Sequence, residues 1–547
     1  MSKTYKIHPA IGFARVGTSG EYFNGPEIPG EFAQPNNGSY RDANKELCRQ
    51  ACTFKIFEYD ETQNQPELIE VGGTIQKIEW SVHLMNKKAV WYQFAGVVGE
   101  GPTGYPANHP LRNAAITNPA ERIKKLIIDP LQRTIIADGS PASHEIERGT
   151  STIPGNETWP PVFTGGKRID SLGTLFVNLK GFLTVAGGYG KSGTPGPLPP
   201  NGQLNYDNND NWFDDTSDGS VTAKLHVSDG TTIQVDAPAW LIVGPPDYAP
   251  PIENLVTVYD LLYDLALRKL GLDATIYNGA FVGGAGGYRP SFTKDIYPIL
   301  RRALDYRFVI KSASPHHSGG NFDIVSLASP PAPGEDPTSN IRSDIFDRLR
   351  DPDNLNGPGS KNMPRLHNDG VDQNPPQPET RKFTITRFQY FAMKQWAAGW
   401  FVSDWTTPAP VPALTPTGMD QAAMEAACGG SFFPGMEGSW ILRDPRIYHT
   451  PFDFRFKHLS IEGVDGVTPG DVTKRMALPW QADFLKCGDS WWPAQRPNQV
   501  KRGSSSQEWA SGILNHVQLV DVWSQLGIVA PDPSNPGEYI ETERTLP

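Results

Sequence analysis

Glycine and proline together restrict this chain to folds with many turns and short segments of regular structure. The 547 residues include 54 glycines and 51 prolines, about a fifth of the chain and well above average usage. Proline lacks a backbone donor and glycine weakens the interior of helices and strands, so both residues favour turns. Because 38% of the residues are hydrophobic, the chain can still bury a core. We therefore predict a folded protein with short strands and long loops rather than a helical bundle.

Alternation of apolar and polar residues marks the first part of the chain as β-rich. Three segments alternate in the way that half-buried strands do: residues 5–8, 54–59 and 75–82. Apolar residues three and four positions apart predict helices further along: residues 256–270, 386–405, 419–428 and 508–526. The predicted fold class is α+β, with a β-rich N-terminal half and a more helical C-terminal third.

Changes of composition along the chain suggest three regions. We expect a β-rich domain over residues 1–250, a mixed segment over 251–385 and a C-terminal domain over 386–547 that carries the active site. A chain of 547 residues is too long to fold around one small hydrophobic core. Residues 329–380 are rich in Pro, Gly, Asp and Asn with little apolar periodicity, which predicts a long surface excursion within the middle region.

Charge and hydropathy argue against two classes of partner. The net charge is −11, without a long basic run, whereas nucleic-acid binding needs clustered Lys and Arg. Without an apolar run of membrane-spanning length, we expect no membrane partner. The opening residues 1–6 lack the apolar segment of a secretory signal, so we expect synthesis in the cytoplasm and leave later export open. Four cysteines in this length argue against a disulfide scaffold.

Several short motifs resemble cofactor sites but lack a defining residue. Residues 187–192 end like a phosphate-binding loop, but Val185 stands where that loop needs its first glycine. The glycine-rich run at 281–287 fails the dinucleotide spacing. The acidic run that begins at Asp214 resembles a calcium loop, but Leu225 replaces the bidentate Glu. We therefore expect neither a bound nucleotide nor a metal.

The most informative cluster lies near the C-terminus, where Asp483 stands four residues before Cys487 among several tryptophans. A thiolate is the nucleophilic form of cysteine, and an electron-rich indole can accept a thioether bond and become a quinone on oxygenation. An aromatic core with a few satisfied polar groups is the alternative interpretation. The cluster comprises Cys428, His449, His458, Asp483, Cys487, Trp491, Trp492, Lys501, Trp509, His516 and Trp523.

Motifs spread along almost the whole chain resemble those of a known family. They are residues 7–17 (IHPAIGFARVG), 25–30 (GPEIPG), 82–89 (VHLMNKKA), 212–215 (WFDD), 386–390 (TRFQY), 428–437 (CGGSFFPGME) and 479–484 (PWQADF). In this order they are similar to the lysine ε-oxidase and glycine oxidase family, whose members carry the protein-derived cofactor cysteine tryptophylquinone.

The resemblance implies roles for residues of the cofactor. Cys487 matches the cysteine that forms the thioether half of the quinone, and Asp483 matches the carboxylate needed for maturation, as a general base. Trp523 best fits the position of the tryptophan partner, and Trp509 is the runner-up. The separation from Cys487 is shorter here than the family pattern, which leaves the choice between the two tryptophans open.

Three further residues are implied in the active site. His449 matches an active-site histidine downstream of Cys428, and Lys501 matches a lysine near the quinone that contacts substrate. Phe213 stands where the lysine oxidase has Tyr and the glycine oxidase has Phe. This last match favours a small amino acid such as glycine as the substrate.

The resemblance also implies an activity and partners. A quinone of this kind oxidises an amino acid or primary amine with dioxygen, giving an aldehyde or oxo acid, ammonia and hydrogen peroxide. The sequence shows no flavin or metal motif that would oxygenate an indole, and the family relies on a separate flavin-dependent maturation protein. We expect the same dependence here, and a homo-oligomer.

Two alternatives to this oxidase remain open. In the first, the chain keeps the family fold as a structural or interaction protein and does not make the quinone. In the second, it is a quinone enzyme that acts on a peptide amine rather than on a free amino acid.

Overall fold

The computed structural model describes most of the chain, with several gaps. The described residues are 3–62, 65–95, 105–310, 323–330, 341–355, 361–367, 382–406, 413–430, 439–450, 453–457, 466–486 and 491–547.

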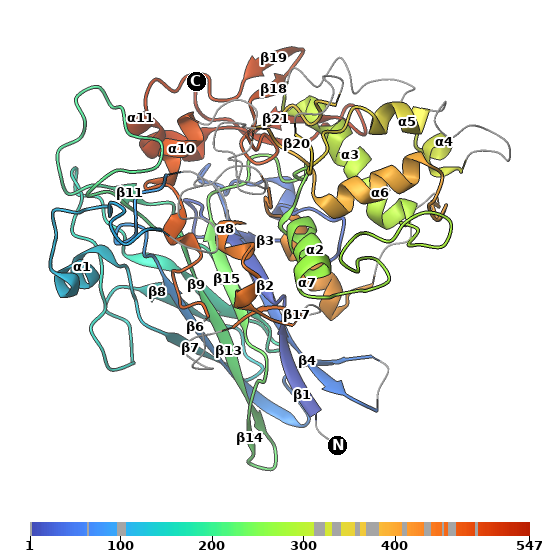
Figure 1. Ribbon diagram of the computed structural model, residues 1–547. Coiled ribbons are helices and arrows are strands. Elements are labelled where there is room, and N and C mark those ends of the chain that lie inside the picture. The colour runs from blue at the N-terminus through green and yellow to red at the C-terminus, as the bar shows by residue number, and fades with distance from the viewer. Residues whose placement is uncertain are drawn as a thin grey trace.

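A large, mostly antiparallel sheet forms the centre of the protein (Figure 1). Its described strands follow the order β7-β6-β13-β15-β2-β4-β10-β9-β8, with β1, β3 and β5 paired to β4 and β14 paired to β13. The strands are β1 (Lys3–His8), β2 (Ile11–Arg15), β3 (Tyr22–Asn24), β4 (Arg49–Asp60), β5 (Glu67–Ile69), β6 (Ile75–Met85), β7 (Arg133–Ala137), β8 (Ala142–Glu147), β9 (Ser171–Val177), β10 (Leu183–Ala186), β13 (Ser217–Val227), β14 (Thr232–Gln234) and β15 (Ala239–Gly244).

The strands of the sheet form where apolar and polar residues alternate in the sequence. Along β6 the side chains of Trp80, Val82 and Leu84 are buried, while the residues between them are half-buried. This period of two lets one face of a strand pack on the core. The strands predicted at 5–8, 54–59 and 75–82 are confirmed as parts of β1, β4 and β6.

Helices lie beside the sheet and above one end of it, as Figure 1 shows for α2, α3 and α6 on one side and α10 and α11 at the top. Those described are α1 (Pro119–Leu126), α2 (Val258–Lys269), α3 (Tyr297–Asp305), α4 (Ile324–Ala328), α5 (Ile341–Phe346), α6 (Arg387–Ala397), α7 (Pro416–Glu425), α8 (Ser439–Leu442), α10 (Trp480–Lys486) and α11 (His516–Val522). The α+β class is confirmed.

Capping residues explain where two of the predicted helices begin. Thr257 caps α2 in a reciprocal box with Asp260, and Thr386 caps α6 in a box with Gln389. Each box satisfies backbone donors at a helix start. The α6 helix is shorter than predicted because Gly399, at a φ of 78°, follows its end.

The helix predicted over residues 508–526 is largely wrong. Glu508 ends a strand, and the helix α11 begins only at His516, where the Asn515 side chain accepts a hydrogen bond from the Gln518 backbone N–H. The apolar residues before Asn515 follow a helical spacing, yet they pack in turns, which Gly512 permits with its φ of 90°.

Short strand pairs complete the described structure. They are β11 (Ser192–Gly193) with β12 (Phe213–Asp214), β16 (Tyr448–Thr450) with β17 (Asp453–Phe456), β18 (Gln499–Arg502) with β19 (Ser505–Glu508), and β20 (Ile528–Pro531) with β21 (Tyr539–Thr542). Part of the predicted excursion at 329–380 lies outside the described residues, and the domain boundaries at 250 and 385 stay predictions.

No helix in the described ranges combines the length and the apolar character that crossing a bilayer requires.

Candidate functional site

A glycine-rich turn that follows β10 covers the indole of Trp523. Gly190 has a φ of 66°, and a Cβ atom placed on it would lie 2.0 Å from Cζ2 and 2.6 Å from Cη2 of Trp523. A side chain at this position would therefore overlap the six-membered ring. Trp523 follows directly after α11 and is 3% exposed, so the turn and the indole form a closed contact in the interior.

Helix α10 supplies the opposite wall of the same pocket of aromatic rings. The Trp480 ring lies 5.3 Å from the Trp523 ring and 4.9 Å from the Phe484 ring, both edge to face. Trp480 and Phe484 are four residues apart on α10, which places them on one face of the helix. The aromatic face of α10 thus packs on Trp523, and α10 also packs on α11.

A fully buried ion pair ties the start of α10 to the strands below it. Asp214 accepts a hydrogen bond from Lys88 Nζ at 2.8 Å and one from the backbone N–H of Trp480 at 3.0 Å. Both charged side chains are 0% exposed. Next to this pair, Ser192 Oγ donates to Gln481 Oε1 at 2.9 Å. The turn, the β11–β12 pair and α10 are therefore fixed to one another.

Asp215 adds a second buried carboxyl beside the turn. It is 0% exposed, and neither of its oxygens has a hydrogen-bond partner of normal geometry among the described residues. Its Oδ2 lies 2.6 Å from where a Cβ on Gly188 would be. Burial raises the pKa of Asp215 to about 7, and the charge of Asp214 adds to this, whereas the Lys191 backbone and ammonium oppose it. Such a group can hold or release a proton near neutral pH.

Asp483, the carboxylate predicted to assist maturation, lies within α10. It is fully buried and stands one helical turn after Trp480, whose ring contacts Trp523. The structure thus brings the helix of Asp483 to the predicted tryptophan. Cys487 follows α10 directly in the sequence and lies outside the described residues.

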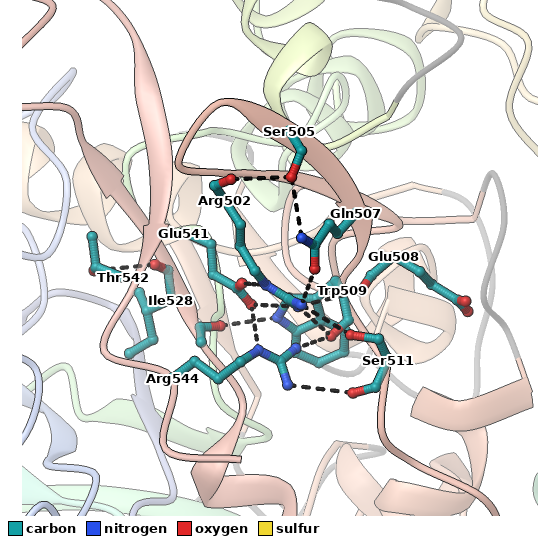
Figure 2. Close-up of polar contacts among 11 residues, drawn as sticks. Arg502, Ser505, Gln507, Glu508, Trp509, Ser511, Ile528, Glu541, Thr542 and Arg544 are labelled. Atoms are coloured by element: carbon teal, nitrogen blue, oxygen red, sulfur yellow. Dashed lines mark hydrogen bonds and ion pairs between the residues drawn. The ribbon is translucent and has the colours of Figure 1, made fainter. Parts of the chain in front are cut away.

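The runner-up, Trp509, occupies a different setting (Figure 2). Its indole N–H donates to the Gly527 carbonyl at 2.9 Å, and Arg496 lies 5.1 Å above its ring. Arg544 donates to its backbone carbonyl and pairs with the buried Glu541. Both the ring nitrogen and the backbone of Trp509 are therefore engaged in structural contacts.

One tyrosine connects the two tryptophans. The Tyr248 hydroxyl donates to the backbone carbonyl of Trp523 at 2.9 Å, and its ring lies 4.6 Å from the Trp509 ring. Tyr248 is fully buried, and it lies between the two tryptophans, in contact with both.

The other predicted site residues lie in different parts of the structure. Lys501 pairs through Nζ with Glu538 at 2.7 Å, and His449 lies exposed on the short strand β16. Phe213 is buried, with its ring stacked 6.1 Å from that of Phe163. The roles of these three residues in the active site stay predictions.

Sequence reasoning missed Lys88, Asp215 and Gly190. A signal was present for each. Lys88 belongs to the family motif at 82–89, Asp215 to the acidic run considered as a calcium loop, and Gly190 to the run considered as a phosphate loop. The last two motifs were rejected because each lacks a defining residue, yet Asp215 and the glycine turn lie close together in the fold. In the described residues no group of three or more His, Cys, Asp and Glu side chains could hold a metal ion.

Comparison with known proteins gives the family. The model of the L-lysine epsilon oxidase N-terminal domain matches residues 8–243, and that of the C-terminal domain matches residues 367–509. The L-lysine 6-oxidase of Marinomonas mediterranea is 29% identical over 604 residues, which cover 99% of this chain and 78% of that protein.

Solved structures agree with the sequence comparison. The crystal structure of the L-Lys epsilon-oxidase from Marinomonas mediterranea matches with a TM-score of 0.82 and 26% identity, over 99% of this chain and 95% of that one. The structure of that enzyme's Schiff base intermediate with L-Lys matches with a TM-score of 0.81 and the same identity and coverage. The fold is therefore that of the L-Lys epsilon-oxidase. The chain belongs to the L-lysine epsilon oxidase family.

The contact between Gly190 and Trp523 predicts that a methyl group added at position 190 destabilises the fold. Gly190→Ala should lower the free energy of unfolding by roughly 2–4 kcal/mol, since an unfavourable φ is combined with overpacking. Gly165→Ala is the matched control, because Gly165 has a φ of 83° and open space around it, and should cost only about 1 kcal/mol. Chemical denaturation of the unmodified precursor measures both, and equal losses would contradict the contact.

The buried Asp215 predicts how stability depends on pH. Its pKa of about 7 lies above the ordinary 3.8, so the folded chain binds an extra proton between these values and loses stability as pH rises through that window. Relative to Asp215→Asn, the wild type should lose up to about 1.4 kcal/mol per pH unit from about pH 5 to pH 7. Denaturant unfolding across that range tests this, and parallel pH profiles for the two proteins would refute it.

Proposed function

We propose that this protein is an oxidase of amino acids or primary amines that uses cysteine tryptophylquinone made from Cys487 and Trp523. The products would be an aldehyde or oxo acid, ammonia and hydrogen peroxide. The observation that carries the proposal is the seating of Trp523 between the glycine turn and the helix of Asp483. The family relationship adds to it, since the relative is an L-lysine 6-oxidase.

The residues around Trp523 fit such a cofactor. An ortho-quinone on the six-membered ring of indole carries its oxygens at the carbons that correspond to Cζ2 and Cη2. These are the two atoms that face Gly190 most closely, where backbone and no side chain lies against the ring. Trp509 instead has the side chains of Tyr248 and Arg496 against its ring. This difference supports Trp523 over Trp509 as the modified residue.

Asp483 is suited to the proton transfers that cofactor formation requires. A carboxylate four residues before a cysteine would lie one turn away from it if the helix continued, and Asp483 is buried within α10. Deprotonation of the indole or the thiol by this group makes either one a better nucleophile. The location of Asp483 on the helix whose Trp480 packs against Trp523 supports this role.

The chain's own residues then exclude water and manage protons around the reacting amine. When formed, the quinone supplies an electrophilic carbonyl and a sink for two electrons. Aromatic side chains of α10 close one wall, and the buried Lys88–Asp214 pair fixes that helix. Asp215, whose buried oxygens have no hydrogen-bond partner of normal geometry among the described residues, is a candidate acceptor for a proton released from the substrate carbon.

Oxygenation of Trp523 requires a partner. A side-chain carboxylate can move a proton but cannot activate dioxygen, which needs a flavin or a metal. We therefore extend the proposal to a flavin-dependent maturation protein, as the family resemblance implies. Expressed alone, the chain should remain an unmodified precursor without oxidase activity.

Intact mass after co-expression with such a flavoprotein tests the cofactor. The mature protein should gain two oxygen atoms, lose four hydrogen atoms and lose one thiol to alkylation. Trp523→Phe and Cys487→Ala should abolish these changes while costing only a few kcal/mol of stability. Trp509→Phe is the matched control and should keep them.

The outcomes separate the competing hypotheses. An unchanged mass with a free Cys487 would favour a structural or interaction protein, and a quinone lost in Trp509→Phe but kept in Trp523→Phe would reverse the choice of tryptophan. A mature quinone with no peroxide produced from any free amino acid would favour a peptide amine as the substrate.

A further inference from the structure

A cluster of positive charges lies on the segment that leads into helix α10. Lys474 is the central residue of a short 3-10 helix, Thr473–Arg475, that precedes α10 in the chain. Thr473 fixes this segment to the large sheet, because its backbone N–H and its hydroxyl both donate to Asp218 of β13, at 2.7 and 2.6 Å. The backbone that carries Lys474 is therefore held in place by the sheet.

Two lysines of this cluster share a single carboxylate oxygen. The Nζ atoms of Lys87 and Lys474 each lie 3.0 Å from Oδ1 of Asp471, so they are at most about 6 Å apart, a distance at which like charges disfavour each other's ionisation. The two lysine side chains are only 16% and 12% exposed, and partly buried charges are screened less than surface charges. One acid thus serves two closely spaced bases.

A tryptophan ring brings a third cation to the same place. Lys474 Nζ lies 3.6 Å from the centroid of the Trp91 ring, and the guanidinium of Arg475 lies 5.5 Å from the same centroid. Three cations therefore surround one carboxylate and one indole. Their mutual repulsion favours the loss of a proton from one of them.

Lys474 is the member of the cluster that loses its proton most readily. Lys87 Nζ donates to Thr468 Oγ1 at 2.7 Å as well as to Asp471, whereas Lys474 Nζ donates to Asp471 and lies over the Trp91 ring, a weaker partner for a cation than an oxygen acceptor. Burial lowers the pKa of Lys474 to about 8; Asp471 opposes this change, and Arg475 and Lys87 add to it.

The acids near the cluster do not restore the balance of charge. Although burial opposes it, Lys474 and Lys87 hold the pKa of Asp471 well below its usual range, so Asp471 is already ionised where Lys474 titrates. Asp444 interacts with Arg475 but is itself paired with Arg446 at 2.6 Å. The single charge of Asp471 therefore remains shared among the cations of the cluster.

A lysine with this titration behaviour is a nucleophile for carbonyl compounds near neutral pH. With a pKa of about 8, roughly a tenth of the Lys474 amines is neutral at pH 7, against roughly one in 3,000 for a lysine at the ordinary 10.5. Attack of the neutral amine on an aldehyde forms a C=N bond and releases one molecule of water.

The surroundings of Lys474 suit an imine better than other adducts of an amine. A protonated imine keeps the positive charge and an N–H on nitrogen, so it can still donate to Asp471 and lie over the Trp91 ring. A carbamate formed with carbon dioxide would instead place a second negative charge beside Asp471. The cluster therefore selects an aldehyde as the reactant.

We propose that Lys474 is a site of covalent modification by small aldehydes, which attach as a protonated imine held by Asp471 over the Trp91 ring. The site itself does not require the quinone. The proposed oxidase function adds one source of the reactant, since oxidation of a –CH2–NH2 group with release of ammonia yields an aldehyde.

Reductive trapping in the unmodified precursor tests the proposal. Acetaldehyde forms the imine, sodium cyanoborohydride delivers hydride to its carbon, and peptide mass spectrometry measures the initial rate of ethylation at each lysine. At pH 7 the rate at Lys474 should exceed that at Lys124, which is exposed on α1, by at least about tenfold, because the gain in neutral amine outweighs the lower exposure. The ratio of the two rates should shrink above pH 8, where Lys474 is already neutral.

Charge variants separate a lowered pKa from simple accessibility. Lys87→Gln and Arg475→Gln each remove a neighbouring positive charge, so the pKa of Lys474 should rise and its rate at pH 7 should fall by about three- to tenfold. Both replacements are smaller than the native side chains, so an effect of accessibility alone would raise the rate instead. Lys224→Gln breaks an exposed ion pair elsewhere on the sheet and, as the matched control, should leave the rate unchanged.

Two results would overturn the assignment. One is a rate at Lys474 no greater than that at Lys124, and the other is faster labelling of Lys474 in both Lys87→Gln and Arg475→Gln. Because the precursor has no quinone and the aldehyde is added, the outcome does not depend on the oxidase proposal. A missing quinone mass leaves a selectively labelled Lys474 standing, and an unreactive Lys474 leaves the oxidase proposal intact.

Discussion

The buried ion pair between Lys88 and Asp214 is the interaction on which the rest of the site depends. Both side chains are withdrawn from water, and removing one partner of such a pair would leave an uncompensated charge at a cost of about 3–5 kcal/mol. Asp214 also accepts the first backbone N–H of α10, where a negative charge is favoured by the helix dipole. One carboxylate therefore fixes the position of the helix that carries Asp483.

Local patterns made much of the fold predictable. Strands β1, β4 and β6 alternate along their length, and α2 and α6 begin at Thr residues that form capping boxes, so their positions follow from neighbours in the sequence. The segment before α11 was misread because its apolar residues are spaced as in a helix. In the fold this segment forms turns, and its Trp509 is held by contacts to distant residues such as the Gly527 carbonyl, which sequence order does not reveal.

The site was predictable only where a residue has a motif of its own. Asp483 and Trp523 were proposed from the C-terminal pattern, and the structure brings Trp523 to the helix of Asp483. Gly190 and Asp215 gain their importance from segments distant in the sequence, since a glycine is required at 190 only because an indole from another part of the chain lies there. Such long-range contacts arise from tertiary packing, which no local pattern records.

The surroundings of Trp523 include contacts between residues that are far apart in the sequence. These contacts determine the order in which this part of the protein can fold. Arg41 donates hydrogen bonds to the carbonyls of Leu526, three residues after Trp523, and of Glu543, while the Glu543 carboxylate accepts from the backbone of Tyr40. During synthesis, Arg41 emerges long before these acceptors exist. The indole can therefore reach its final surroundings only after residues as far as Glu543 have been made and have met Arg41, which lies 502 positions earlier in the sequence.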